Sequence, residues 1–308
     1  MASDLTVTAT PPTAPWSYAP RPAEGGFADF VKCSGLSAYR YSGLMSLHAR
    51  LRRLTHSPYS AILLFHRVSD LVPPDGLTVD VKRFREFCAL MRRRYRVVPL
   101  AEIFRGLRDR TPPPPSTVAI TFDDSYADNL PAAEVLHEFG LPATFFVPTD
   151  YIGTDCVFPW DAHLPRLGNL TWADVRRMVA LGHDIGSHTA SHADLAKLSI
   201  EETRDELVRS KAVLEDQLGR PVRYLAYPFG SRDHIRNEQL PLVYDVGYEG
   251  CVSAVHGFVE EGMHGRILPR AAVPNFRSLP HLEVHLNRCL DWIHDLKRRF
   301  GRSESALM

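Results

Sequence analysis

The sequence has no long hydrophobic run, no excess of charge of either sign, and no cysteine pattern that builds a disulfide framework or a zinc finger. Its longest apolar stretches are like residues 61–65, whereas a membrane-spanning helix needs about 18–20 apolar residues. The 36 Lys and Arg residues balance the 36 Asp and Glu residues, which argues against a dedicated nucleic-acid binder. We expect free thiols in a reducing compartment, because the five cysteines are scattered over positions 33, 88, 156, 251 and 289.

The remaining composition is that of an ordinary globular protein, with 44% hydrophobic and 23% charged residues in a chain of 308. Residues 1–26 are rich in Pro, Thr and Ala, which indicates a flexible tail. We expect a helical extension over residues 27–60 and one catalytic domain, ending in a helix, over residues 61–308. The N-terminus lacks the basic region and hydrophobic core of a secretory signal, so we expect a cytoplasmic protein.

The helical extension contains a basic amphipathic segment. Leu44, Leu47, Leu51 and Leu54 recur there with helical spacing, and three arginines occupy other positions. This pattern predicts a helix that packs on the domain through its leucines. The alternative is a peripheral contact with the inner face of a membrane, because basic amphipathic helices bind at such surfaces.

From residue 61 onward, short β-branched or aromatic runs alternate with helical patterns. The expected strands cover residues 61–65, 96–100, 118–122, 143–147, 184–187, 224–226 and 267–270. The expected helices cover residues 81–94, 101–108, 129–139, 172–181, 200–218, 235–246 and 281–300, with Thr171 as an N-cap. Repeated strand–helix units of this kind predict an α/β fold with a parallel sheet.

An acidic pair, Asp123 and Asp124, closes the apolar strand over residues 118–122. Carboxylates at the end of a buried strand are costly to desolvate, and in a parallel barrel this strand end is where chemistry takes place. The alternative is an Asp pair that builds a turn or caps the next helix.

A second motif, Ser-His-Thr-Ala-Ser-His over residues 187–192, begins with the last residue of the expected strand over residues 184–187. His188 and His192 are spaced i, i+4, which on a helical turn places their Cβ atoms about 5–6 Å apart. Two imidazoles at this distance suit one metal ion, and one added carboxylate gives a site with open positions for water and substrate. The pattern therefore favours a metal site over two structural histidines.

A third motif, Leu-Ala-Tyr-Pro-Phe-Gly over residues 225–230, also follows a strand. Pro and Gly fix a turn there and allow close approach to the backbone. The turn either connects strand and helix only, or forms a groove wall whose backbone N–H faces an oxyanion.

Together these motifs resemble, in order and spacing, those of polysaccharide deacetylases of the NodB-homology type, carbohydrate esterase family 4. The resemblance covers roughly residues 60–275. His66-Arg67-Val68 and Leu268-Pro269-Arg270 resemble a subset of the family that includes exopolysaccharide N-deacetylases. The resemblance implies a distorted (β/α) barrel and metal-dependent removal of N-acetyl groups from sugars.

The resemblance also implies roles for individual residues. Asp123 matches the catalytic base of the family, and the matching metal ligands are Asp124, His188 and His192. The backbone N–H of Phe229 matches the group that holds the oxyanion. Tyr227 and His66 are expected to line the substrate site.

Several family positions differ in this chain. Ser125 replaces the usual Gly after the acidic pair, and Ala226 replaces the Arg that orients the base. We hypothesise that Arg270, from another strand end, takes over that role. The fourth and fifth family motifs are not recognisable, so His256 and His264 are the candidates for the general acid.

The sequence therefore predicts an enzyme that releases acetate from an N-acetylhexosamine in a saccharide. The alternatives are an O-acetyl esterase or a non-sugar amide hydrolase on the same scaffold, and a barrel that binds glycans or a partner without catalysis. Zinc is the expected cofactor, with cobalt, nickel or manganese as alternatives. The sequence leaves the saccharide and the oligomeric state open.

Overall fold

A computed structural model describes residues 35, 38–39, 42–55, 58–111, 113–114, 116–273 and 278–289. The expected tail over residues 1–26 lies outside the described residues, as does the part of the expected last helix beyond residue 289. None of the described helices combines the length and hydrophobicity needed to cross a bilayer.

In the described part of the chain, seven parallel strands close into a distorted (β/α) barrel. Their order around the barrel is β1 (Tyr59–Phe65), β11 (Ile267–Ala272), β9 (Gly250–His256), β8 (Tyr224–Ala226), β7 (Asp184–Ser187), β6 (Thr144–Val147) and β5 (Thr117–Phe122). The barrel closes because β1 pairs with both β11 and β5. This confirms the fold class predicted from the sequence.

Four further short strands of the described chain lie outside the closed ring of the barrel. β10 (Val259–Glu260) pairs antiparallel with β1, and β4 (Arg96–Val97) pairs parallel with β5. β2 (Arg67–Val68) and β3 (Thr78–Val79) form a separate two-stranded ribbon.

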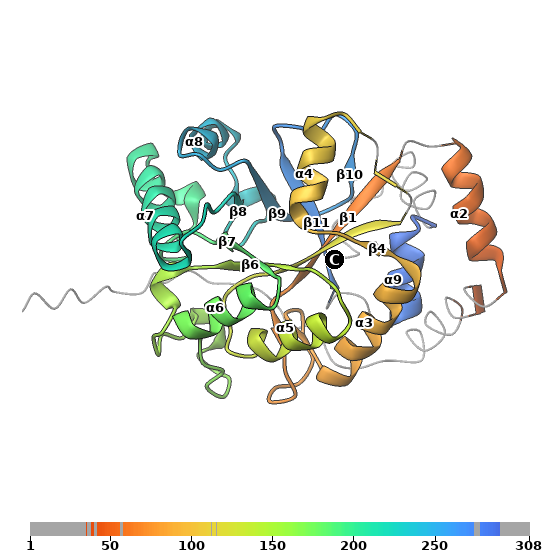
Figure 1. Cartoon of the computed structure of the whole chain (residues 1–308), viewed down its shortest axis with the longest axis horizontal. Helices are drawn as coiled ribbons and strands as arrows, with labels where there is room; N and C mark the ends of the chain where they lie inside the picture. The colour runs from red at the N-terminus through yellow and green to blue at the C-terminus, as the bar shows by residue number, and fades with distance from the viewer. Residues whose placement is uncertain are drawn as a thin grey trace, which may run out of the picture.

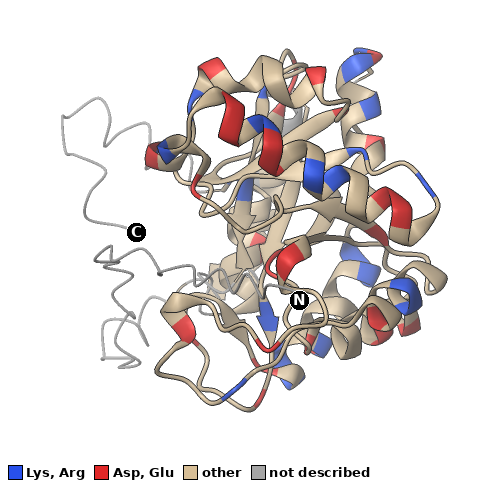
Figure 2. Ribbon diagram, turned by 90° about the vertical axis from the view of Figure 1, so that its left-hand side faces the viewer, with Lys and Arg blue, Asp and Glu red and all other residues tan. Residues whose placement is uncertain are grey.

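Helices surround the barrel, as Figure 1 shows. The α-helices are α2 (Leu44–Thr55), α3 (Val81–Arg94), α4 (Leu100–Arg108), α5 (Asn129–Glu138), α6 (Trp172–Ala180), α7 (Ile200–Leu218), α8 (Leu240–Asp245) and α9 (Leu279–Leu286). Short 3-10 helices are η1 (Thr149–Tyr151), η2 (Pro159–Asp161), η3 (Leu195–Lys197), η4 (Arg232–His234) and η5 (Asn237–Gln239). Acidic and basic residues are interspersed over the helices in the view of Figure 2, in keeping with the balanced charge of the chain.

Helix boundaries follow local signals in the sequence. Thr171 caps α6 and Ser199 caps α7, each within a capping box that satisfies backbone N–H groups of the first turn. α7 ends at Gly219, whose φ of 63° is left-handed and costs glycine little. The predicted N-cap at Thr171 is confirmed.

Alternation along the strands divides the core into two layers. Ile62 faces the barrel interior with Ala226 and residues of α4, whereas Phe65 and Phe122 face the helices outside. The rings of Phe65 and Phe122 stack at 5.0 Å. Such aromatic pairs stabilise a core by about 0.5–1.5 kcal/mol beyond their buried area.

Expected and observed elements differ in several places, among them the last helix, which ends at Leu286 although it was expected to continue past residue 289. The strand expected over 96–100 stops at Val97, because Pro99 leads directly into α4. The helix expected over 235–246 divides into η5 and α8. Strand β9 was not expected; its residues, Gly-Cys-Val-Ser-Ala-Val-His, mix small and polar residues and give only a weak strand pattern.

The predicted helix over residues 44–54 is present, but Leu44 and Leu47 do not lie on its packing face. Leu44 and Leu47 are 55% and 54% exposed. Met45 packs instead against Val284 and Cys289, which places α2 beside α9 at the edge of the molecule (Figure 1). The predicted packing through these two leucines was wrong, because α9 meets α2 on another face.

Candidate active site

Polar side chains gather where the barrel strands end. His66 follows β1, the acidic pair follows β5, His188 follows β7, and the 227–230 turn follows β8. Because these strands are parallel, their carboxyl ends meet at the same edge of the barrel.

Asp124, His188 and His192 converge on one point. All three are buried, and their potential ligand atoms lie within 4.8 Å of one another. Nε2 of His188 lies 3.3 Å from Oδ1 of Asp124, and Nε2 of His192 lies 3.2 Å from the same oxygen. Two imidazoles and one carboxylate are a donor set that divalent metals accept, so these side chains fit a metal ion.

A backbone contact supports this fit. Nδ1 of His188 lies 2.8 Å from the carbonyl oxygen of Ala226, which requires the proton on Nδ1. In the neutral imidazole the lone pair then lies on Nε2, 3.3 Å from Oδ1 of Asp124, whereas in the protonated form Nε2–H donates a hydrogen bond to that carboxylate. Metal-binding histidines commonly have their second nitrogen fixed in this way.

In the cluster, burial and the neighbouring groups shift the pKa values of Asp124 and His188 in opposite directions. Burial alone would raise the pKa of Asp124, but hydrogen bonds from His188 and His192 hold that pKa well below its usual range. Burial would lower the pKa of His188, but the carboxylates of Asp123 and Asp124 outweigh it and raise that pKa. Asp124 is therefore an ionised ligand candidate.

Asp123 is held by Arg270. The guanidinium donates two hydrogen bonds to its carboxylate, at 2.8 and 2.6 Å, and Arg270 is completely buried. Further hydrogen bonds run from Arg270 to the carbonyl of Ser253 and the hydroxyl of Thr121. Burial opposes ionisation of Asp123, but Arg270 outweighs it and lowers the pKa of the carboxyl group. The structure thus brings together the two groups that the Arg270 hypothesis links.

The backbone is strained at these turns. Among the described non-glycine residues, eight have a left-handed φ, and five of those lie at the strand ends that form the cluster. The five are Asp124 (77°), Ser125 (56°), Thr189 (66°), His192 (58°) and Phe229 (61°). Such strain persists where surrounding contacts fix the backbone, and it concentrates at functional sites.

The third motif contributes Phe229 to the site. The Phe229 ring lies 4.8 Å from the His192 ring and 5.6 Å from that of Trp160. Gly230 is required beside it, because its φ is 61° and an added Cβ would lie 2.5 Å from the backbone nitrogen of Ala254.

Tyr227 does not reach the site. Its side chain is buried in the layer between the barrel and the helices, and this burial raises its pKa. Ala226 faces the barrel interior, so its neighbour faces outward by the alternation of an extended chain. The prediction that Tyr227 lines the substrate site was wrong.

Neither histidine predicted as general acid joins the cluster. The ring of His256 lies 4.6 Å from that of His285 on α9. His264 is exposed in the turn that leads into the amino end of β11, the end opposite to the cluster. Proximity in sequence to β11 does not reveal which end of the barrel a residue reaches.

His66 does lie in the cluster. Its Nδ1 is buried and has no hydrogen-bond partner among the described residues. Burial lowers the pKa of His66 and outweighs the attraction of Asp124 and Asp123. The ring also interacts electrostatically with Arg270 and His188, which places it beside the base and a metal-ligand candidate.

A buried polar network beside the cluster was missed by the sequence analysis. Arg67 pairs with Asp161, and Asp161 accepts a hydrogen bond from the hydroxyl of Tyr126. That hydroxyl accepts one from Nε1 of Trp160, whose ring lies 5.2 Å from the His192 ring. The available signal was an arginine two residues after an apolar strand and a Trp-Asp pair after a proline.

Comparison with known proteins agrees with this geometry. Residues 110–250 match the family model described as polysaccharide deacetylase. Over this stretch the chain resembles the polysaccharide deacetylase family. YxkH of Bacillus subtilis is 27% identical over 207 residues, which cover 66% of this chain and 68% of YxkH.

Relatives with named activities match over shorter stretches. A chitin deacetylase of Pestalotiopsis is 33% identical over 118 residues, which cover 38% of this chain and 35% of that protein. A chitooligosaccharide deacetylase of Bradyrhizobium is 30% identical over 117 residues, 37% of this chain and 46% of that protein. The chain thus spans less than half the length of either protein.

Solved structures show the same fold. The Streptococcus pyogenes deacetylase PplD is similar with a TM-score of 0.63 and 24% identity, over 74% of this chain and 97% of PplD. IcaB of Ammonifex degensii has a TM-score of 0.63 and 21% identity, over 75% of this chain and 98% of IcaB.

Proposed function

We propose that this protein is a metal-dependent N-deacetylase of saccharides that contain N-acetylhexosamine. One observation carries the proposal: Asp124, His188 and His192 face one point, and a carboxylate fixed by Arg270 stands beside them. The named activities of the chitin and chitooligosaccharide deacetylases support the substrate class.

The Asp–His–His triad is the proposed holder of a divalent cation. When bound, such a cation polarises the acetyl carbonyl and lowers the pKa of water. The ligand set favours zinc, and cobalt, nickel and manganese accept the same donors.

Asp123 is the proposed general base. Its low pKa keeps it ionised at neutral pH, so it can accept a proton from the water that attacks the acetyl carbonyl. Arg270 contacts both carboxylate oxygens and so fixes the direction in which the base approaches that water. The backbone N–H of Phe229, in its strained turn, is the proposed donor to the oxyanion.

His66 is the proposed proton donor to the departing amine. It lies in the cluster, and its buried Nδ1 has no hydrogen-bond partner among the described residues. A neutral imidazole carries one acceptor nitrogen and one N–H. His66 would take up, at the acceptor nitrogen, the proton that Asp123 accepted from water, and release one to the amine as the C–N bond breaks. Trp160 and Phe229 are proposed to form the wall against which the sugar packs.

The decisive experiment measures acetate release from N-acetylglucosamine oligomers, with and without a chelator, and from O-acetylated saccharides in parallel. We expect activity on the N-acetylated substrates that chelation abolishes and added Zn²⁺ restores. Activity that survives complete removal of metal would contradict the metal role. Preference for O-acetyl groups would identify an esterase, and no activity with any substrate would favour a binding protein.

A matched pair of variants tests the proton donor. His66→Gln should retain zinc binding and lose about 10²–10⁴-fold in kcat, the usual contribution of a general acid. His264→Gln, in an exposed turn, should retain wild-type kcat. Loss of activity in His264→Gln alone would reverse the assignment.

We also propose that α2 binds an anionic membrane surface. Leu44 and Leu47 are exposed, Arg50 is exposed near them, and the helix contains no acidic residue. Its charge is therefore complementary to anionic lipid, and its exposed leucines can enter the interface. The helix stands at the edge of the molecule, where a flat surface can reach it (Figure 1).

Sedimentation with phosphatidylglycerol vesicles tests this contact. Leu44→Asp combined with Leu47→Asp should reduce the bound fraction several-fold relative to wild type. Val208 and Val213 on α7 are also exposed, so Val208→Asp with Val213→Asp is a matched control that should bind normally. Equal binding by both double variants, or no binding by wild type, would contradict the membrane contact without affecting the proposed chemistry.

A further inference from the structure

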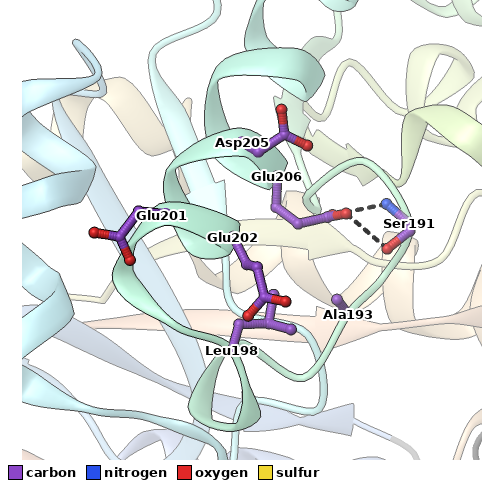
Figure 3. A pocket seen from close by; sticks show the side chains of 7 residues that line it. All are labelled: Ser191, Ala193, Leu198, Glu201, Glu202, Asp205 and Glu206. Atoms are coloured by element: carbon purple, nitrogen blue, oxygen red, sulfur yellow. Dashed lines mark hydrogen bonds between the residues drawn. The ribbon is translucent and has the colours of Figure 1, made fainter.

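Glu206 of α7 accepts hydrogen bonds from the turn that carries His188 and His192. Its side chain is buried, with the residue 7% exposed. Oε2 accepts hydrogen bonds from the backbone N–H groups of Ala190 and Ser191, at 3.0 and 2.9 Å. Oε1 accepts a hydrogen bond from the Ser191 hydroxyl at 2.8 Å. Figure 3 shows this carboxylate pointing at Ser191, while its neighbours on α7 point elsewhere.

The opposite side of the same turn is held by backbone groups. The carbonyl of Ala190 accepts a hydrogen bond from the N–H of Asp150, and the carbonyl of Thr189 accepts one from the N–H of Thr149. Arg209 links the two sides, because it donates to the carboxylates of both Asp150 and Glu206. The turn between the two histidines is thus held through its N–H groups and its carbonyls.

This turn needs such support. Thr189 and His192 both have left-handed φ values, 66° and 58°, which are unfavourable for residues with a Cβ. Without partners for the N–H groups of residues 190 and 191, the turn would lose the contacts that offset this strain. The imidazoles of His188 and His192 would then lose their common direction.

We propose that Glu206 is a positioning residue that sets the affinity of the site for a divalent cation. This role rests on the proposed function of the Asp–His–His triad. Glu206 contacts none of the three proposed ligands through its side chain; it acts through the backbone between two of them. Groups that orient metal ligands in this way typically change metal affinity about 10–100-fold when they are replaced.

Titration of Zn²⁺ into the chelator-treated full-length protein tests the role. Glu206→Gln keeps the size of the side chain, but its amide nitrogen cannot accept a hydrogen bond from the turn. We expect this variant to bind Zn²⁺ about 10–100-fold more weakly than wild type. At saturating Zn²⁺ its kcat should recover most of the wild-type value, with an unchanged KM for the saccharide.

Glu201→Gln is the matched control. Glu201 lies on the same helix and lines the same surface cavity as Glu206, and it points away from the Ser191 turn (Figure 3). The Glu201→Gln variant should bind Zn²⁺ with the affinity of the wild-type protein. Ser191→Ala, which removes one of the hydrogen bonds to Glu206, should weaken Zn²⁺ binding less than Glu206→Gln does and serves if Glu206→Gln fails to fold.

The outcomes separate the two proposals. If wild type binds Zn²⁺ and both Glu206→Gln and Ser191→Ala bind it equally well, the positioning role is overturned and the deacetylase proposal stands. The role is also overturned if Glu201→Gln weakens binding as much as Glu206→Gln, because the effect then reflects surface charge. If wild type binds no divalent cation, the proposed metal site itself fails.

Discussion

The strand ends of β5 and β7 supply the same cluster but hold their functional groups in different ways. After β5, the side chain of Asp123 accepts two hydrogen bonds directly from Arg270 of β11. After β7, the histidines are placed through the backbone of their turn, which Glu206 and residues 149–150 hold. The β5 end therefore depends on a buried ion pair, and the β7 end on backbone hydrogen bonds.

This difference matches the role proposed for each group. A general base needs a fixed charge at a fixed angle, and a bidentate guanidinium provides both. Metal ligands need a common direction for their lone pairs, which the geometry of the turn provides. We therefore expect damage at β5 to remove catalysis and stability together, and damage at β7 to weaken metal binding first.

The largest effect is expected from removing the base. Asp123→Asn should lower kcat about 10²–10⁴-fold, because the amide cannot accept the proton from water. Zn²⁺ affinity should change little, since the triad of Asp124, His188 and His192 is intact. Steady-state kinetics and zinc titration measure the two quantities separately, and a variant with wild-type kcat would exclude Asp123 as the base.

Removing Arg270 should affect activity and stability together. Arg270→Ala leaves the carboxylate of Asp123 buried without its ion pair, which typically costs about 3–5 kcal/mol of unfolding free energy. Arg85→Ala is the control, because Arg85 and Glu138 form an exposed pair that contributes about 0–1 kcal/mol. Urea unfolding compares the two; equal stability losses, or full activity in Arg270→Ala, would contradict the role given to the buried pair.

Asp128, in the turn after β5, is expected to make the free energy of unfolding depend on pH. Burial raises the pKa of Asp128 to about 7 in the folded protein, above the ordinary value of about 3.9. Between these two values the folded state binds more protons than the unfolded state, so this group lowers stability as pH rises from about 4 to about 7. Asp128→Asn should remove that contribution and be stabilising relative to wild type near pH 8 but not near pH 4. Denaturation midpoints that shift equally at both pH values would refute this.

The smallest effects concern backbone strain at the two ends. Ser125 and Thr189 both have left-handed φ values, so Ser125→Gly and Thr189→Gly should relieve about 1–2 kcal/mol of strain, less the entropy cost of glycine. The net change in unfolding free energy should be within about 1 kcal/mol of zero at both sites. Only Thr189→Gly should also weaken Zn²⁺ binding, because its turn places the histidines. Equal zinc affinities for the two variants would remove the distinction between the strand ends.

Local patterns predicted the parts of the site that lie close together in sequence. Asp123 and Asp124 end an apolar strand, and His188 and His192 share a turn, so short spacings were sufficient to find them. The two histidines predicted as proton donor lie outside the cluster for the opposite reason. His256 and His264 are near Arg270 in sequence, but closure of the barrel brings His66, from the first strand, to the cluster instead.

By itself the sequence determined the alternating strand–helix pattern, the resemblance to polysaccharide deacetylases, and the residue types of the proposed metal triad, because these depend on periodicity and on side-chain chemistry over a few residues. Only the tertiary structure decided which groups support them. Arg270 meets Asp123 across 147 positions of sequence, and Glu206 meets Ser191 across 15. Such contacts depend on strand register and on the closure of β1 onto β5 and β11, which no local pattern encodes.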